Sequence, residues 1–113
     1  MSEQAVLQIQ ENANAVVATI QCAEFDHDTT AQLRAEIDGA IAPTSTLPVL
    51  LDLSIVTFMP SMTLGALIEI ANRCKSQQRR LVLVGVTASV RDVFKLTALS
   101  NFFEIRDCVE DVV

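Results

Sequence analysis

Residues 49–65 (VLLDLSIVTFMPSMTLG) constrain the fold of this chain more than any other stretch. The run at 49–53 is apolar apart from one aspartate, which is typical of a strand buried on both faces of a parallel sheet. A break follows, and an apolar segment with helical spacing begins at Ser61. The stretch therefore predicts a central strand that leads into a helix, as in layered α/β folds.

Ser61 stands at the point where this strand gives way to the helix. A helix N-terminus has unpaired N–H groups and the positive end of the helix dipole, so it tolerates an anion or a phosphorylated side chain. Serine is also a preferred N-cap residue, so a purely structural role as a cap stays open. Ser61 is nevertheless the main candidate functional residue in the sequence.

The rest of the chain continues the alternation of strands and helices. An opening hairpin is predicted from residues 6–10 and 15–22, with turn residues between them. Asp26 is a good N-cap for an amphipathic helix at 27–42 that ends near Pro43. The remaining expected elements are a loop at 43–46, a helix at 61–77, a strand at 81–86, a helix at 88–97, a short strand at 102–105 and at most two helical turns at 108–113. This order predicts an α/β fold with a mixed sheet, an N-terminal hairpin and helices packed on the sheet.

Helical spacing also predicts which side chains point inward. They are expected to be Leu33, Ile37 and Ile41 on the first helix, and Leu64, Leu67, Ile68, Ala71 and Cys74 on the second. Glu69 and Arg73 have the i,i+4 spacing of an ion pair on the opposite side of the second helix. Arg79 and Arg80 are expected to form a solvated exit from that helix.

The charge balance argues against two classes of partner. The 113 residues have a formal net charge of −6, whereas nucleic acids and anionic membrane surfaces require a basic patch. The charge is uneven, with eight acids and one base through Asp52 and six acids and seven bases from Leu53 onward. An acidic partner surface would therefore be tolerated in the second half of the chain.

The length fits one domain, residues 1–113. Cys22, Cys74 and Cys108 are odd in number and widely spaced, which predicts reduced thiols rather than a disulfide framework or a C-x-x-C site. The N-terminus lacks the basic and apolar regions of a signal peptide, and no segment has the apolar length of a membrane span. We expect a soluble, cytoplasmic protein with no direct membrane insertion.

Motifs for catalysis and for cofactor binding are absent from the sequence. The only histidine, His27, lies between Asp26 and Asp28 at a predicted helix start, where adjacent side chains diverge and cannot converge on one metal ion. Nothing in the sequence supports a Ser-His-Asp or Cys-His set, and neither glycine-rich nucleotide motif occurs. We expect no catalytic residue, no metal and no cofactor, and therefore a protein that is not an enzyme.

Several motifs of the chain resemble those of the STAS domain, the fold of bacterial anti-sigma factor antagonists. That family has a D-L-S-x-V-x-F-M-like run followed by D-S-S-G-L-G, and the corresponding residues here are 52–59 (DLSIVTFM) and 60–65 (PSMTLG). Residues 24–29 (EFDHDT) are similar to the family's E-L-D-x-x-T segment. Residues 81–86 (LVLVGV) and 90–99 (VRDVFKLTAL) extend the resemblance, which spans nearly the whole chain.

The resemblance implies a regulatory protein–protein interaction module of the STAS fold. In that family the unmodified protein binds an anti-sigma factor that is also a serine kinase, which frees a sigma factor, and phosphorylation of a serine ends the binding. By position the phosphoacceptor is Ser61, with Thr63 as the second candidate. The expected partner-binding residues are Asp26, His27, Phe58, Met59, Pro60, Ser61, Met62, Thr63 and Ala66.

Departures from the family motif keep other functions open. Pro60, Met62 and Thr63 stand where the family has aspartate, serine and glycine. The alternative is a STAS interaction subunit without a switch, such as the cytoplasmic partner of a lipid-transport ATPase complex. A third alternative, an anion- or small-ligand-binding module, depends only on the helix start, and a weak homodimer also stays open.

Overall fold

The computed structural model describes residues 5–41 and 46–112. The elements follow one another as β1 (Leu7–Glu11), β2 (Val16–Ile20), α1 (His27–Ala40), β3 (Val49–Asp52), α2 (Ser61–Ser76), β4 (Leu81–Val84), α3 (Ala88–Leu96), β5 (Glu104–Arg106) and a short 3₁₀ turn, η1 (Val109–Asp111). The strands form one sheet in the order β1-β2-β3-β4-β5, in which β1 is antiparallel to β2 and all other neighbours are parallel. The predicted mixed sheet with an N-terminal hairpin is therefore confirmed, and β3 is its central strand.

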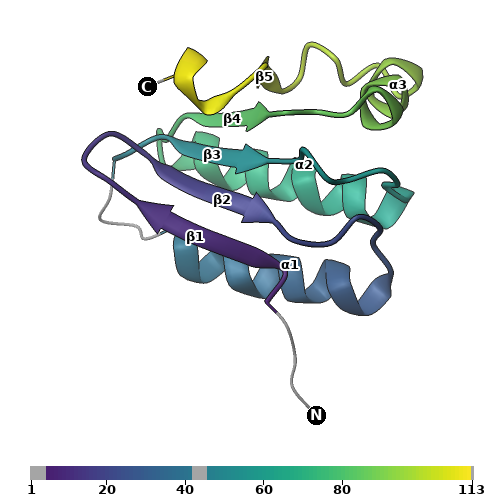
Figure 1. Ribbon diagram of the computed structural model, residues 1–113, viewed down its shortest axis with the longest axis horizontal. Helices are drawn as coiled ribbons and strands as arrows, with labels where there is room; N and C mark the ends of the chain where they lie inside the picture. The colour runs from purple at the N-terminus through teal and green to yellow at the C-terminus, as the bar shows by residue number, and fades with distance from the viewer. Residues whose placement is uncertain (1–4, 42–45, 113) are drawn as a thin grey trace.

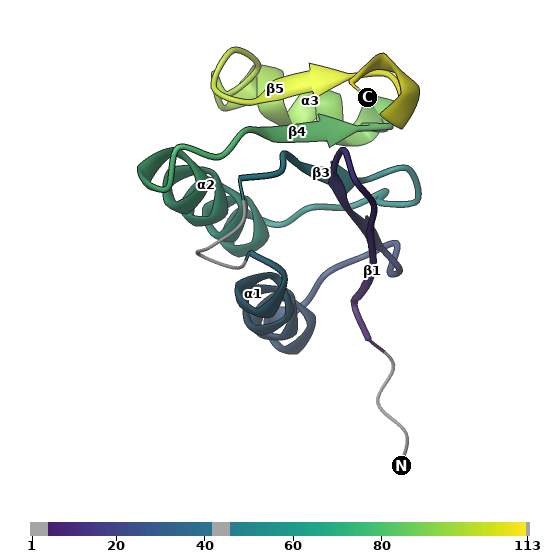
Figure 2. The ribbon, with the colours of Figure 1, turned by 90° about the vertical axis from the view of Figure 1, so that its left-hand side faces the viewer.

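The helices connect the parallel strands and cover one face of the sheet. α1 and α2 lie side by side behind the sheet, and α3 lies near one end of β4 (Figure 1). The view turned by 90° separates the layers, with α1 and α2 on one side of the strands and η1 on the other (Figure 2). Within the described ranges, no helix combines the length and the apolar content needed to cross a lipid bilayer.

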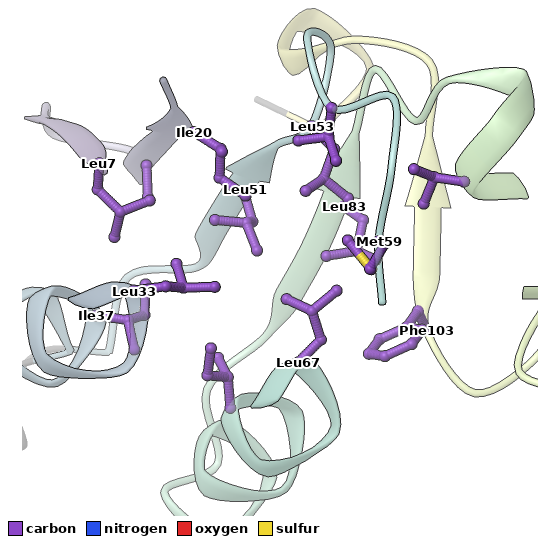
Figure 3. Close-up of a cluster of buried hydrophobic side chains, with 14 of the residues drawn as sticks. Leu7, Ile20, Leu33, Ile37, Leu51, Leu53, Met59, Leu67, Leu83 and Phe103 are labelled. Carbon is purple, nitrogen blue, oxygen red and sulfur yellow. The ribbon is translucent and has the colours of Figure 1, made fainter. Parts of the chain in front are cut away.

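The main core lies between the sheet and the helices (Figure 3). Because side chains alternate along a strand, Leu51 points into this core and Leu50 points to the opposite face. The cluster on that opposite face comprises Ala15, Leu50, Val82 and Val84, and Val109 and Val112 pack against it. Both faces of β3 are therefore buried, as its apolar run predicts.

Hydrogen bonds to two side chains hold the turn of the β1–β2 hairpin and the start of the edge strand β1. Asn12 Oδ1 accepts hydrogen bonds from the backbone N–H groups of Asn14 (2.7 Å) and Ala15 (2.9 Å), which closes the turn between β1 and β2. The Glu36 carboxylate on α1 accepts from the N–H groups of Val6 (3.0 Å) and Leu7 (2.8 Å). Glu36 thus satisfies backbone donors at the start of the edge strand β1 and links that strand to α1.

The ion pairs of α2 differ from the prediction. Glu69 does not pair with Arg73; its Oε1 lies 3.4 Å from Arg34 Nη2 on α1, and Arg73 pairs with Asp38, also on α1. The predicted intrahelical pair is wrong because α1 and α2 pack side by side and offer partners across the contact. The ion pairs therefore link the two helices.

The buried face of α2 is also shifted from the predicted one. Leu64, Leu67 and Cys74 are buried as expected, but Ile68 and Ala71 are only partly buried. Ile70, which the spacing argument left out, is 5% exposed. On α1 the prediction for the inward side chains Leu33, Ile37 and Ile41 is confirmed.

Arg79 differs most clearly from the prediction that the side chains after the end of α2 are solvated. Its side chain is 4% exposed, and its Nε and Nη2 donate to the Leu47 carbonyl at 3.0 and 2.7 Å. Gln78 has a positive φ of 57°, which turns the chain directly before Arg79. The expectation of a solvated side chain is thus wrong for Arg79, whereas Arg80 is exposed and pairs with Glu104.

The remaining boundaries differ by a few residues. The last strand is β5, shifted from the expected 102–105 because Phe103 packs into the core against Phe94, with ring centroids 5.2 Å apart. The C-terminal segment forms the single turn η1. Of the loop expected at 43–46, Pro43 and the two residues after it lie outside the described residues, as does the predicted end of the first helix at 42.

Candidate functional site

The loop between β3 and α2 is held against the segment that follows β2. The Ala23 carbonyl accepts hydrogen bonds from the N–H groups of Thr57 (2.8 Å) and Phe58 (3.3 Å), and Phe58 forms an isolated parallel bridge with Glu24. Since β2 and β3 are parallel, α1 and α2 both begin at the carboxyl end of the sheet. The loop contacts bring these two helix starts together.

Ser61 is the first residue of α2 and not its cap. The N-cap is Pro60, whose extended backbone (φ −71°, ψ 165°) places its carbonyl to accept from the N–H groups of Thr63 and Leu64, each at 3.0 Å. Ser61 is exposed, and its hydroxyl makes no hydrogen bond with any residue that the structure describes. The alternative that Ser61 serves as an N-cap is therefore wrong. The first turn of α2 contains no acidic residue, so nothing in that turn opposes an added negative charge.

Large apolar side chains are exposed in the same segment. Phe58 is 55% exposed, Ile55 47% and Met62 44%. Single exposed apolar residues are ordinary on a protein surface, but several in one short segment are typical of an interaction site. Ile55 was not among the predicted site residues. The only feature of the sequence that could have indicated it is that a large apolar residue lies within a predicted loop.

Three predicted partner-binding residues face the core instead. Met59 is 4% exposed and packs in the cluster that includes Leu83 and Phe103 (Figure 3). Thr63 and Ala66 are both 0% exposed. These side chains have no surface to offer a partner, which corrects the prediction for them, and the buried Thr63 hydroxyl is also inaccessible to a kinase in this conformation.

The Thr63 hydroxyl has a structural role. Its Oγ1 lies 2.9 Å from Thr30 Oγ1 on α1, and Thr30 Oγ1 donates to the Asp26 carbonyl at 2.7 Å. A hydroxyl has one proton to donate, so Thr63 is the donor in the bond between the two threonines. Sequence reasoning missed Thr30, because its partner comes from a distant part of the chain.

Asp26 begins α1, as predicted. Its carboxylate accepts from the Thr29 N–H at 2.8 Å, and the Thr29 hydroxyl in turn accepts from the Asp26 N–H at 2.7 Å, which forms a capping box. The hydrogen bonds from the backbone and the side chain of Thr29 hold the pKa of the Asp26 carboxyl below its usual value.

His27 lies next to the start of α2. It lines a hollow of about 200 Å³ together with Thr30, Ala31 and Arg34 of α1 and Met62 of α2. Its imidazole is exposed and lies 3.8 Å from the Asp28 carboxylate. In the described part of the chain, no three histidine, cysteine, aspartate or glutamate side chains come together as metal ligands. The structure thus brings Asp26, His27, Phe58, Ser61 and Met62 to one end of the molecule, with Pro60 partly buried between them.

Several solved structures share the fold of this chain. The chain is similar to the anti-sigma factor antagonist SpoIIAA in its unphosphorylated form, with 24% identity over 93% of this chain and 90% of that chain and a TM-score of 0.74. It is similar to the Bacillus cell fate determinant SpoIIAA in the phosphorylated form, with 23% identity over 93% of both chains and a TM-score of 0.70. It is also similar to an anti-sigma-factor antagonist (STAS) domain protein from Planctomyces limnophilus, with 18% identity over 93% and 92% of the two chains and a TM-score of 0.84.

These structures share the mixed sheet and the helices described above, so the fold expected from the resemblance is confirmed. A family model for the STAS domain matches residues 6–112. The match covers nearly the whole sequence and includes both helix starts at the candidate site. The chain belongs to the STAS domain family.

Proposed function

We propose that this chain is an anti-sigma factor antagonist that binds an anti-sigma factor with serine kinase activity and is released when Ser61 is phosphorylated. The observation that carries the proposal is the exposed Ser61 hydroxyl, which is not engaged by the described residues, at the first position of α2. In this function the chain is acted upon, and the kinase supplies the nucleotide and the metal ion. The similarity to SpoIIAA, which has been solved in phosphorylated and unphosphorylated forms, supports the same assignment.

The helix start favours an added phosphate. A phosphoserine carries about −1.5 to −2 charges, and the free N–H groups and dipole at a helix N-terminus stabilise negative charge. No acidic residue in the first turn of α2 would repel the phosphate. Phosphorylation of Ser61 is therefore expected to leave the fold intact.

The surroundings of Ser61 explain why a phosphate would disrupt binding. Phe58, Met62 and Ile55 offer exposed apolar surface on the same segment, and His27 and Met62 border a hollow of about 200 Å³. We expect a side chain of the partner to enter this hollow. A partner that covers this surface must also cover Ser61. A doubly charged phosphate would then lose its hydration inside an apolar contact, which is costly when no cation pairs with it.

Phosphorylation is tested on the intact chain with the ATP-binding partner isolated from the native host. Incubation with ATP and Mg²⁺ is expected to add one phosphoryl group, measured by intact mass, and the Ser61→Ala variant should gain none. Ser89→Ala is the matched control, because Ser89 is an exposed serine in the first turn of α3. Equal gain of mass by wild type and Ser61→Ala would contradict the assignment of Ser61.

A STAS interaction subunit without a switch is the second candidate function. The observation that favours it is Pro60 at the N-cap, because no acidic side chain lies beside Ser61 to orient its hydroxyl. Binding of the same partner to Ser61→Asp and Ser61→Asn separates the two functions, since the variants differ in charge but hardly in size. A switch predicts a loss of affinity for Ser61→Asp alone, whereas a constitutive subunit predicts similar affinity for both.

A further inference from the structure

A second candidate binding site lies at the other end of α2. A cavity of about 230 Å³ is bordered there by the last turns of α2, the start of β4 and the segment that precedes β5. With a rise of about 1.5 Å per residue, Lys75 in this cavity is roughly 21 Å along the helix from Ser61. The cavity is therefore separate from the surface assigned to the protein partner.

One wall of the cavity is apolar. It is formed by Leu81, Phe102 and Phe103. The ring of Phe102 meets that of Phe103 edge to face, with centroids 5.0 Å apart, and remains 42% exposed. Such a wall accommodates a ring or a branched aliphatic group, and an aromatic side chain that stays open to solvent gains from being covered.

The rest of the lining includes three cationic side chains, Lys75, Arg79 and Arg80. The exposed Lys75 ammonium makes no ion pair with any of the residues described in the structure. The guanidinium of Arg79 is buried and donates to the Leu47 carbonyl. The Lys75 ammonium is therefore the positive charge that an anionic group in this cavity would meet.

The acidic residue in the cavity is already paired and does not neutralise Lys75. Arg80 donates to the Glu104 carboxylate through Nε, at 2.8 Å from Oε1, and through Nη2 to Oε2. Arg106 Nη2 also lies 3.0 Å from Glu104 Oε2. The negative end of the α2 dipole is also offset, because the Arg73, Cys74 and Lys75 carbonyls accept hydrogen bonds from the turn at Gln77. The local excess of charge is therefore positive.

We propose that this cavity binds a small organic anion that combines one carboxylate with an aromatic or branched aliphatic body. The carboxylate pairs with Lys75, and the apolar body lies against Phe102 and Leu81. The volume of this cavity, about 230 Å³, lies below the usual range for sites that bind drug-sized ligands, so the ligand is a compact one. The assignment does not depend on the function proposed for Ser61.

The proposal is tested by amide ¹H–¹⁵N NMR titration of the full chain with phenylacetate, which supplies both features. Saturable shifts are expected for residues 71–75 and 102–104, with little change at residues 61–63. Acetate lacks the apolar body and 2-phenylacetamide lacks the charge, so both are expected to bind roughly tenfold more weakly. Equal binding of phenylacetamide, or the absence of saturable shifts at the cavity, would overturn the proposal.

Variants locate the site. Lys75→Gln is expected to weaken phenylacetate binding by roughly tenfold through loss of a charge-assisted contact. Lys95→Gln is the matched control, because Lys95 is an exposed lysine in the last turn of α3, outside the cavity, and should bind as wild type does. Phe102→Ser removes the apolar wall and leaves the cations in place, so it should weaken phenylacetate more than acetate. Equal loss for the two lysine variants would show nonspecific attraction and reject the site.

Discussion

Thr63 of α2 donates a hydrogen bond to Thr30 of α1, with 2.9 Å between the two hydroxyl oxygens. The Thr30 hydroxyl in turn donates a hydrogen bond to the carbonyl of Asp26, the N-cap of α1. Both threonines are buried, so the two bonds form a polar link in the interior between the first turns of the helices. Because Thr63 lies two residues after Ser61, the link fixes the helix turn that presents the proposed phosphoacceptor.

Substitution of the two threonines should have unequal effects on the free energy of unfolding. Thr63→Val removes one donor, and Thr30 keeps its bond to Asp26, so a loss of about 1 kcal/mol is expected. Thr30→Val leaves the buried Thr63 hydroxyl without its acceptor and should cost about 1–3 kcal/mol. The double variant should lose less than the sum of the two, as measured by urea denaturation. Strictly additive losses would show that the two hydroxyls are not coupled.

Gly85 and Gly39 should respond to alanine in opposite directions. Gly85 has a φ of 66°, and an added Cβ would lie 3.0 Å from Ser54 Cβ and 3.3 Å from Asp52 Oδ1. Gly85→Ala is therefore expected to lower the free energy of unfolding by about 1–3 kcal/mol. Gly39 lies in α1, and apart from its chain neighbours and the backbone of its own helix no atom lies within 4 Å of an added Cβ. Gly39→Ala should therefore raise stability by about 0.5 kcal/mol. Thermal or urea unfolding of the two variants measures both changes, and a change of the same sign in both would contradict the argument.

The sequence predicts the local part of this fold well. The strand β3 and the capped helix α1 follow from patterns within short segments, namely an apolar run and an N-cap before an amphipathic stretch. The position of Ser61 at the start of α2 was also predictable, although the proline before it takes the capping position. Local patterns are sufficient where neighbouring residues determine the conformation.

The features that the sequence did not predict depend on contacts between distant segments. Arg73 pairs with Asp38 because two helices meet, and Arg79 is buried because a turn places it under the Leu47 carbonyl. The burial of Met59, Thr63 and Ala66 likewise depends on which face of the α2 region meets the sheet. A motif of adjacent residues contains both inward and outward side chains, so resemblance alone could not separate exposed residues that could contact a partner from residues of the core.

The Glu104 carboxylate on the edge strand β5 should make the free energy of unfolding depend on pH. Its hydrogen bonds with Arg80 lower the pKa of the carboxyl below its usual value of 4.5, despite the opposing effect of partial burial. The ionised form is the one favoured by folding, so the stabilisation is present above pH 4.5 and is lost as the pH falls through the lowered pKa.

Comparison of wild type with Glu104→Gln in urea denaturation between neutral and acidic pH measures this effect. Wild type should be the more stable protein at neutral pH, and the difference should shrink as the pH falls below 4.5. The same comparison in an Arg80→Gln background should show a smaller dependence on pH. A difference between wild type and Glu104→Gln that stays constant with pH would contradict the role of the carboxylate.

A negative charge introduced at Ser61 should stabilise the isolated chain, although under the proposed function it should weaken partner binding. Ser61→Asp places a negative charge at the first position of α2, where no other acid lies in the first turn, and should raise the free energy of unfolding by about 0.3–1 kcal/mol at low salt. Ser61→Asn is the neutral control, and Ser61→Lys should lower stability by a similar amount. The differences should decline at high ionic strength, because exposed charges are screened. Destabilisation by Ser61→Asp would indicate that phosphorylation acts by opening the fold. Retained stability together with loss of partner binding would indicate that the charge acts directly at the interface with the partner.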